Sequence, residues 1–466
     1  MKVIHKQILF VLLGALLPGT FNACAPMQAV HEQLENRDQA SNTPEPTPPP
    51  TPPPANTTNP VYPVYGTCES PATTFKRTIY VDPSNGSDTG DGSMATPFKT
   101  LAVTFAGKKI LSGDHVVILP GDHGAVSVTK YTNPALENSA DWLWLDFKDG
   151  ASAKSLKISD VRRFLITGVE ASGNSKPLVS IGGGSNFVIA DSYLYTSENT
   201  AAWTVNDWIG AANGINFRNT PCVSILRNKI LNVAFGIGVS SDAPALPENS
   251  LKTLIMDNEI RNFSGDGIRP IGSDILISKN KILDSYASAA DGDDNHDDAI
   301  QLWALNGAVY DNIIIDGNYV NDRTSQTRSF KGQCQGISIF DGTVSRLVIR
   351  NNVVIVSAYH GVMMMGGKDG LIENNTVASS TPGLNPWVGV WNMKSGAPPI
   401  NVIVRNNIGA SLNFNGVMSG LTKENNYTVP TANAPQNYMA YDLATSNFDL
   451  RPLPGSSIDG KGAGAL

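Results

Sequence analysis

The most unusual stretch of the sequence runs from Asp291 to Trp303. It reads Asp-Gly-Asp-Asp-Asn-His-Asp-Asp-Ala-Ile-Gln-Leu-Trp, so five carboxylates and one imidazole lie within eight residues. Like charges at this density repel one another unless a cation or a basic side chain offsets them. One interpretation is a catalytic centre in which His296 works beside Asp298 as an acid or base. Another is a Ca²⁺ site, since hard cations bind carboxylate oxygens. Its ligands would be Asp291, Asp293, Asp294 and Asp297. A solvated acidic turn is the plain alternative.

Basic side chains follow this segment at Arg323, Arg328 and Lys331. Arginine binds a carboxylate through two parallel hydrogen bonds, whether the carboxylate belongs to the protein or to a ligand. These residues are therefore expected either to anchor the acidic segment or to bind an acidic substrate.

A repeat surrounds these candidate residues and must position them. An Asn-x-(Ile/Val) motif recurs at intervals of roughly 22 to 38 residues, and a Gly-Ile-like pair follows most copies. The motif begins at Asn228, Asn258, Asn280, Asn318, Asn352 and Asn375. Repeat periods of about 20–50 residues indicate a solenoid. The uneven spacing predicts a constant rung with loops of variable length inserted on one side, and such insertions often mark the binding face.

Aligning the rungs on the Gly-Ile pair gives two columns of residues. The column before the pair contains Asn213, Phe235, Asp266, Asp298, Gln335 and His360. The column after it contains Asn216, Gly238, Arg269, Gln301, Ser338 and Met363. Side chains alternate across a strand and adjacent rungs lie about 4.8 Å apart, so both columns are expected to face outward as close neighbours. Asp, Arg and His converge there, which favours a polar site over a solvated face with amide ladders.

Aromatic residues near these columns are candidates for sugar-stacking platforms or for buried caps. They are Trp203, Trp208, Trp303 and Tyr359. Trp303 directly follows the columns and is expected to contact a substrate.

The first part of the folded region resembles a known family. Tyr80-Val81-Asp82-Pro83-Ser84-Asn85-Gly86-Ser87-Asp88, Thr96-Pro97-Phe98-Lys99-Thr100-Leu101 and Gly113-Asp114-His115-Val116-Val117-Ile118-Leu119-Pro120-Gly121 are similar to the opening of secreted proteins of the pectate-lyase-like superfamily. Phe448-Asp449-Leu450-Arg451-Pro452 resembles their usual end. The resemblance implies an all-β fold, a right-handed parallel β-helix solenoid. The helical spacing of Leu101, Phe105, Ile110 and Leu111 predicts a short capping helix at its N-terminal end.

That superfamily includes polysaccharide lyases, uronan epimerases and glycoside hydrolases, so the resemblance implies a polysaccharide as the partner, and an anionic one is expected. A lyase or C5-epimerase would need a base, for which His296 and His360 are candidates. It would also need a group that neutralises the uronate carboxylate: Arg269, Arg323, Arg328, Lys331 or a bound Ca²⁺. A glycoside hydrolase would use two carboxylates, such as Asp266 and Asp298. A surface adhesin without catalysis is the third hypothesis.

Composition and the N-terminal residues indicate which partners and which cellular location to expect. Charged residues make up 16% of the chain and the net charge is −7, which argues against a nucleic-acid partner. Residues 1–23 have the features of an export signal, and Phe21-Asn22-Ala23-Cys24 resembles a bacterial lipobox. Cys24 is thus expected to carry the lipid that holds the exported protein on a bacterial membrane, at the outer membrane or cell surface; ordinary signal cleavage is the alternative.

The remaining sequence divides into a Pro-rich linker over residues 24–69 and a β-helix domain over residues 70–466. Three cysteines remain after Cys24, namely Cys68, Cys222 and Cys334. Their odd number and wide spacing predict no disulfide framework, and Cys222 is expected to be a buried core residue.

Overall fold

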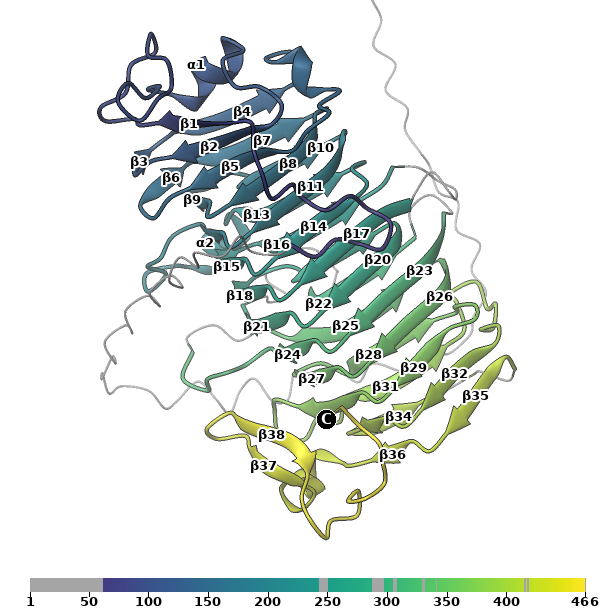
Figure 1. The fold of residues 1–466 in the computed structure, drawn as a ribbon. Coiled ribbons are helices and arrows are strands. Elements are labelled where there is room, and N and C mark those ends of the chain that lie inside the picture. Colours follow the sequence, from purple (N-terminus) through teal and green to yellow (C-terminus); the bar gives the residue numbers. More distant parts are fainter. Residues whose placement is uncertain are drawn as a thin grey trace, which may run out of the picture. The chain divides into compact units, whose positions relative to one another are not determined.

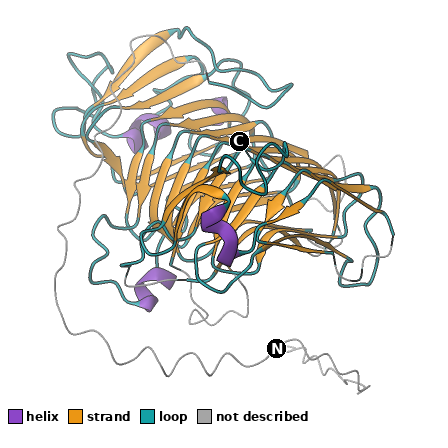
Figure 2. Cartoon of the chain, turned by 90° about the horizontal axis from the view of Figure 1, so that it is seen from below, coloured by secondary structure: helices purple, strands orange, loops and turns teal. Residues whose placement is uncertain are grey.

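The folded chain is a coil of three long parallel β-sheets (Figure 1). The computed structural model describes residues 62–242, 250–286, 297–304, 308–328, 332–340, 342–414, 416 and 419–465. From β2 to β36 successive strands join the three sheets in turn, so each rung of the coil adds one strand to each sheet. Strands make up most of the elements drawn in Figure 2, and the helices are short. Among the described residues, no helix is both long and apolar enough to cross a bilayer.

The strands of each sheet are as follows. The thirteen-stranded sheet contains β1 (Arg77–Val81), β2 (Asp114–Ile118), β5 (Leu143–Phe147), β8 (Arg162–Thr167), β11 (Ser185–Ala190), β14 (Val223–Leu226), β17 (Ser250–Met256), β20 (Ser273–Ser278), β23 (Val309–Asp316), β26 (Thr343–Arg350), β29 (Leu371–Glu373), β32 (Val402–Arg405) and β35 (Leu421–Glu424). The eleven-stranded sheet contains β4 (Ala125–Thr129), β7 (Ser155–Ser159), β10 (Val179–Gly182), β13 (Asn213–Arg218), β16 (Phe235–Ser240), β19 (Ile268–Ile271), β22 (Asp297–Trp303), β25 (Cys334–Phe340), β28 (His360–Met365), β31 (Trp387–Trp391) and β34 (Ser411–Asn413). The twelve-stranded sheet contains β3 (Gly121–Asp122), β6 (Ala151–Ala153), β9 (Glu170–Ser172), β12 (Tyr193–Tyr195), β15 (Lys229–Val233), β18 (Glu259–Phe263), β21 (Lys281–Ser285), β24 (Tyr319–Asn321), β27 (Val353–Val356), β30 (Thr376–Ser379), β33 (Ile408–Gly409) and β36 (Tyr427–Thr428).

The turn from the thirteen-stranded to the twelve-stranded sheet explains the repeated Asn motif. From β8 to β36 this turn has two residues in every rung. In most rungs the first residue is left-handed, as at Arg227 (φ 53°) and Asn351 (φ 55°). From β14 onward the second residue is the motif asparagine, and its side-chain amide donates to the side-chain oxygen of the asparagine in the next rung, as from Asn280 to Asn318 at 3.0 Å. The repeat is thus a buried asparagine ladder that fixes this turn.

Insertions occur in the other two turns, and both of these turns flank the eleven-stranded sheet. The turn before that sheet includes residues 196–212, with helix α2 (Val205–Ile209), and residues 322–333. The turn after it includes residues 241–242, where the description breaks off until β17, and residues 392–401. The insertions therefore lie on two sides of the sheet, where the uneven spacing had predicted one, because the ladder leaves only one turn constrained.

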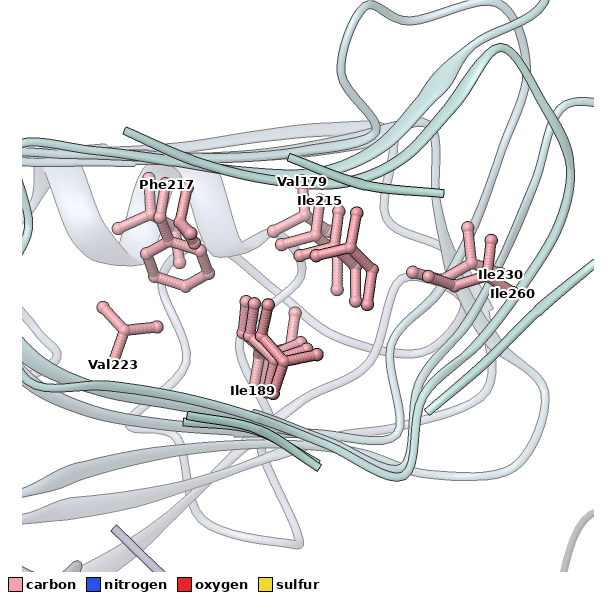
Figure 3. Close-up of a cluster of buried hydrophobic side chains, with 14 of the residues drawn as sticks. Val179, Ile189, Ile215, Phe217, Val223, Ile230 and Ile260 are labelled. Atoms are coloured by element: carbon pink, nitrogen blue, oxygen red, sulfur yellow. The ribbon is translucent and has the colours of Figure 1, made fainter. Parts of the chain in front are cut away.

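The core inside the coil consists of stacked apolar columns, which Figure 3 shows for seven labelled residues. Ile215 and Val179 belong to the eleven-stranded sheet, Ile189 to the thirteen-stranded sheet, and Ile230 and Ile260 to the twelve-stranded sheet. Each of these side chains is at most 1% exposed. Burial of one such side chain contributes about 1.5–3 kcal/mol, so the columns hold the three sheets in register.

The two ends of the coil are covered. Helix α1 (Leu101–Ala106) lies at the N-terminal end, and the hydroxyl of its N-cap Thr100 accepts the N–H of Val103. The helix is shorter than the spacing predicted, because Gly107 ends it and Leu111 lies outside it at 44% exposure. Near the C-terminus, η6 (Thr431–Gln436), the hairpin of β37 (Tyr438–Asp442) with β38 (Asn447–Pro452) and the final residues pack on the twelve-stranded sheet. A further short helix, η3 (Pro134–Leu136), follows β4.

Residues 62–76, here called the N-terminal strap, pack along the outer face of the thirteen-stranded sheet. Tyr65 receives a hydrogen bond from Asn312 of β23 at 2.9 Å, whereas Phe75 lies 5.5 Å from Trp144 of β5. The strap therefore runs against the direction in which the rungs advance. Its apolar side chains cover Leu165, Val188 and Leu226. Residues 62–69 belong to the folded unit, although composition placed them in the linker.

A disulfide between Cys68 and Cys222 fastens the strap. The expectation that Cys222 is a buried core residue is wrong, because this cysteine lies in the turn before β14 and bonds to the strap. The cysteine count and spacing had predicted no disulfide framework, and they could not reveal this pair because 154 residues separate the partners and only the fold brings them together. Cys334 is the free, buried cysteine.

Removing this disulfide is expected to lower stability. A crosslink that closes so long a loop restricts the unfolded chain, and its loss typically costs about 2–4 kcal/mol. Cys68→Ser/Cys222→Ser should therefore unfold at a lower temperature than the wild type in a thermal scan. A reducing agent should lower the wild-type midpoint and leave that of the double variant unchanged. Equal midpoints for all four samples would contradict the role of the crosslink.

Candidate functional site

The eleven-stranded sheet is the face that the described chain leaves without an apolar cover. Outside the core, the described residues form two apolar clusters. One is the strap on the thirteen-stranded sheet, and the other is the C-terminal segment on the twelve-stranded sheet. The inserted loops flank the remaining sheet, which makes its outer face the natural place for a ligand.

The strand register confirms the two aligned columns on this face. Asn213 pairs with Phe235, and Asp298 pairs with Gln335. In the second column Gly238 pairs with Arg269, and Gln301 with Ser338. Asp266 lies just before β19 and so precedes the paired residues of that strand. It is joined to the next rung by the backbone N–H of Asp298, which donates to Asp266 Oδ1 at 2.9 Å.

A contact between residues three apart repeats in successive rungs and joins the columns. Arg269 forms an ion pair with Asp266. Gln301 Nε2 donates to Asp298 Oδ2 at 2.8 Å, and Ser338 Oγ donates to Gln335 Oε1 at 3.2 Å. In each of these three rungs, the second column therefore contacts the polar side chain of the first column.

These contacts bury most of the polar column, contrary to the expectation that it faces solvent. Asp266 is 2% exposed, Asp298 0% and Gln335 3%. Arg269 and Trp303 are half-buried and supply the accessible chemistry beside them. The alignment predicted which residues are neighbours, but it could not predict that the carboxylates lie beneath the surface.

Asp298 is the most perturbed group of the column. Burial, and then the negative charge of Asp266, raise the pKa of Asp298 well above its usual range. The single hydroxyl hydrogen of Ser338 is donated to Gln335, and Asp298 Oδ1 has no hydrogen-bond partner among the described residues. Asp298 therefore keeps its proton in conditions where an ordinary aspartate has lost it.

Asp298→Asn is expected to flatten the dependence of stability on pH. Because the folded pKa of Asp298 is raised, its contribution is full below the unfolded pKa of about 3.9 and is lost as the pH rises through the folded pKa. An asparagine does not titrate, so the variant should lose this decline and match or exceed the wild-type thermal midpoint at neutral pH. Midpoints measured from acid to neutral pH test this, with Asp242→Asn as a surface control. An unchanged slope in Asp298→Asn would contradict it.

Arg269 presents a fixed positive charge on the face. Its guanidinium carbon lies 4.1 Å from the ring centre of Phe235 and 5.4 Å from that of Trp303. The ion pair with Asp266 and these two rings hold the side chain, which is still 30% exposed. Such a group is suited to bind an incoming carboxylate.

His360 lies further along the coil, inside a group of aromatic rings. Its Nδ1 lies 2.6 Å from Gln335 Oε1, and because an amide oxygen only accepts, the imidazole donates this hydrogen bond. Phe340 and Trp387 lie 5.4 and 5.3 Å from its ring centre. Three rungs separate β28 from β19, which is about 14 Å, so His360 and Arg269 belong to different parts of the face.

Other candidate residues lie in the loops that precede the sheet. Arg328 is almost buried, pairs with Asp284 at 2.8 Å and lies over the Tyr286 ring, so it anchors its own loop. The Arg323 guanidinium donates to Gly332 O at 3.4 Å, and burial lowers the pKa of Arg323. Trp208 is 2% exposed and stacks on Tyr286, which makes it a buried cap and no platform.

Several candidates lie outside the described residues. They are Cys24, Asp291, Asp293, Asp294, His296 and Lys331. Of the predicted Ca²⁺ ligands only Asp297, the first residue of β22, is described. Within the described residues, no group of three or more His, Cys, Asp or Glu side chains could hold a metal ion.

Sequence reasoning missed Trp387 and Trp391. Trp387 pairs with His360 and continues the first column by one more rung, and Trp391 pairs with Met365. The alignment stopped at His360 because Val388 and Gly389 stand where the Gly-Ile pair would be. The paired tryptophans of the segment Trp-Val-Gly-Val-Trp were the available signal.

Comparisons with known proteins identify the architecture. A family model described as "Right handed beta helix region" matches residues 213–427, which run from β13 to the start of β36. A search of curated proteins found no match.

Solved structures with the same kind of coil include enzymes and an adhesin. A rhamnogalacturonan lyase is 14% identical over 84% of this chain and 99% of its own, with a TM-score of 0.41. The A-module of the mannuronan C-5 epimerase AlgE4 from Azotobacter vinelandii is 14% identical over 75% of this chain and 94% of its own, with a TM-score of 0.35. The Streptococcus pneumoniae surface protein and adhesin PfbA is 8% identical over 68% of this chain and 89% of its own, with a TM-score of 0.36. Likeness at this level carries no conclusion about activity. The family match over residues 213–427 and the three-sheet coil show that this chain folds as a right-handed parallel β-helix, which is the fold that the resemblance in the sequence implied.

Proposed function

We propose that this protein is a polysaccharide lyase or C5-epimerase that acts on a uronate-containing polymer at the eleven-stranded sheet. The observation that carries the proposal is the geometry of Arg269, an arginine held by Asp266 and by two aromatic rings while part of its guanidinium stays accessible. A glycan-binding face has little need for such a cation unless the sugar is acidic.

Both reactions remove the proton next to a uronate carboxylate, and negative charge then develops on that carboxylate. A preorganised cation stabilises this charge more in the transition state than in the ground state. Arg269 would do so without reorganising, because Asp266 already fixes its position. Arg323, which lacks a carboxylate partner among the described residues, is a second candidate to bind an acidic group of the polymer.

The base is proposed to be His296, which directly precedes Asp297 and Asp298 in the sequence. The rung of β22 that follows it is the neighbour of the Arg269 rung. His360 is three rungs from Arg269 and would meet a different sugar of the same chain. Bound Ca²⁺, with the Asp291–Asp297 carboxylates as ligands, remains a proposed cofactor that would share the neutralising role.

A glycoside hydrolase is the second candidate, and the raised pKa of Asp298 beside Asp266 favours it, since a hydrolase needs one protonated and one ionised carboxyl group. Its weakness is burial, because both side chains are at most 2% exposed and a general acid must reach the glycosidic oxygen.

The proposed setting is outside the cytoplasm, with Cys24 lipidated and the protein attached to a bacterial membrane. The Cys68–Cys222 disulfide supports export, since disulfides persist mainly in oxidising compartments.

Incubation of the full-length protein with polygalacturonate, alginate and glucuronate-containing polymers tests the proposal, with and without a chelator. A lyase should produce absorbance from unsaturated ends, and an epimerase should change the uronate composition without cleavage. Reducing ends without that absorbance would indicate the hydrolase, and binding without any change would indicate an adhesin. Turnover that survives in both His296→Ala and Asp298→Ala would overturn the placement of the site.

A further inference from the structure

The far end of the same face carries a group of three aromatic rings, the exposed Tyr359 and the half-buried Trp387 and Trp391, here called the aromatic platform. Tyr359 is 52% exposed and stacks on Trp387 with ring centres 5.3 Å apart and planes at 19°. Trp387 and Trp391 lie 5.9 Å apart on β31. Flat rings arranged in this way offer apolar faces on which a sugar ring can stack.

The platform depends on a glycine between the two tryptophans. A side chain at Gly389 would come within 3.0 Å of the Trp387 ring and 2.7 Å of the Asn413 carbonyl oxygen. Because no side chain stands there, the two indoles can lie close to the sheet. The Trp391 indole N–H donates to Asn413 Oδ1 at 3.1 Å, which fixes that ring.

Charge is segregated along the face. The rungs of β13, β19 and β22 carry Arg218, Asp266, Arg269 and Asp298. The corresponding columns of β25, β28 and β31 contain no Asp, Glu, Lys or Arg. Their members are Gln335, Ser338, Phe340, His360, Met363, Met365, Trp387, Gly389 and Trp391. The columns of these three strands therefore contain no Lys or Arg to bind a uronate, and a protonated His360 would be their one cation.

Polar edges accompany the rings, as a pyranose requires. The Trp387 indole N–H is buried, so the polar groups beside the Trp387 ring belong to its neighbours. The His360 imidazole lies beside the Trp387 ring and donates to the side-chain amide of Gln335. Apolar ring faces beside the half-buried His360 imidazole complement a sugar that has an apolar face and equatorial hydroxyl groups.

We infer that the aromatic platform binds an uncharged sugar residue of the polymer whose uronate binds at Arg269, so that the substrate is a heteropolymer of acidic and neutral sugars. This inference rests on the proposed function for the acidic subsite. Four rungs separate β19 from β31, about 19 Å, and the polymer would lie along the coil axis across them.

Binding of neutral oligosaccharides to the full-length protein tests the platform without any need for catalysis. The probes are oligosaccharides of neutral galactan, glucan and mannan, followed by calorimetry and by tryptophan fluorescence. The wild type is expected to bind at least one of them. Tyr359→Ala and Trp391→Ala should weaken that binding about tenfold, whereas Tyr359→Phe, which keeps the ring, should bind like the wild type. Tyr131→Ala is the matched control, because Tyr131 is an aromatic residue at 82% exposure that follows β4, at the opposite end of the eleven-stranded sheet from the platform.

Arg269→Ala separates this inference from the proposed function. The variant should bind the neutral probe normally and lose uronate binding. Failure of all three neutral probes to bind the wild type would overturn the platform, even if uronan turnover is found. An equal loss in Tyr131→Ala would overturn it too. So would a Tyr359-dependent dimer in sedimentation without sugar binding, since the rings would then be an interface between copies of the chain.

Discussion

Arg269→Ala is expected to reduce kcat on a uronan substrate by about 10²–10³-fold, as the loss of one preorganised charge-stabilising group does in other enzymes. The Arg269 guanidinium lies between the rings of Phe235 and Trp303 and is partly accessible. Among the described residues of the two columns from β19 to β31, Arg269 is the only Arg or Lys. Arg269→Lys should recover little of the activity, because an ammonium cannot bind Asp266 and a substrate carboxylate with the same planar geometry.

Removal of Arg269 also leaves Asp266 buried without its partner, which could lower stability by about 3–5 kcal/mol and imitate a catalytic defect. The double variant Asp266→Asn/Arg269→Ala removes both charges and should fold with a near-normal thermal midpoint while remaining inactive. Arg218→Ala is the matched control, since Arg218 stands on the same sheet, pairs with Asp242 and is 66% exposed. Full turnover by the double variant, or an equal loss in Arg218→Ala, would contradict the role of Arg269.

The strand register of the site was predictable because two local features repeat. The Asn motif fixes a two-residue turn, and the Gly-Ile pair places an apolar residue in the core, so counting from either one brings Asp298 beside Gln335. The same counting could not predict burial. Asp266 and Asp298 are covered because Arg269 and Gln301 fold back onto them, and those contacts depend on side-chain positions in three dimensions.

Contacts between residues far apart in the sequence could not be predicted from the repeat, for a different reason. The strap carries no repeat, and its position follows from apolar side chains such as Tyr62 that find a stripe on the thirteen-stranded sheet. Only that path brings Cys68 to Cys222. Because the strap covers the thirteen-stranded sheet, the eleven-stranded sheet is the face on which a ligand can bind, although the strap itself packs on a different sheet.

Asn318→Ala is expected to lower the free energy of unfolding by about 3–5 kcal/mol, because four hydrogen bonds meet at this side chain in the middle of the ladder. Its amide donates to Ile277 O and to Asn352 Oδ1, each at 3.0 Å. Its oxygen accepts from the backbone and side-chain N–H groups of Asn280, also at 3.0 Å. Alanine would leave these partners unpaired where no water reaches, since Asn280 and Asn352 are both 0% exposed.

The effect should be graded along the ladder, and this gradient distinguishes the ladder from a general sensitivity of the coil. Asn426 ends the ladder and is half-buried, so Asn426→Ala should cost less than Asn318→Ala. Asn216 is exposed on β13, and Asn216→Ala should stay within about 0.5 kcal/mol of the wild type. Denaturant unfolding of the three variants provides the measurement. If Asn318→Ala lowered the free energy of unfolding no more than Asn216→Ala, the asparagine ladder would be a consequence of the turn and not its cause. The left-handed residue before each asparagine would then be what fixes the turn.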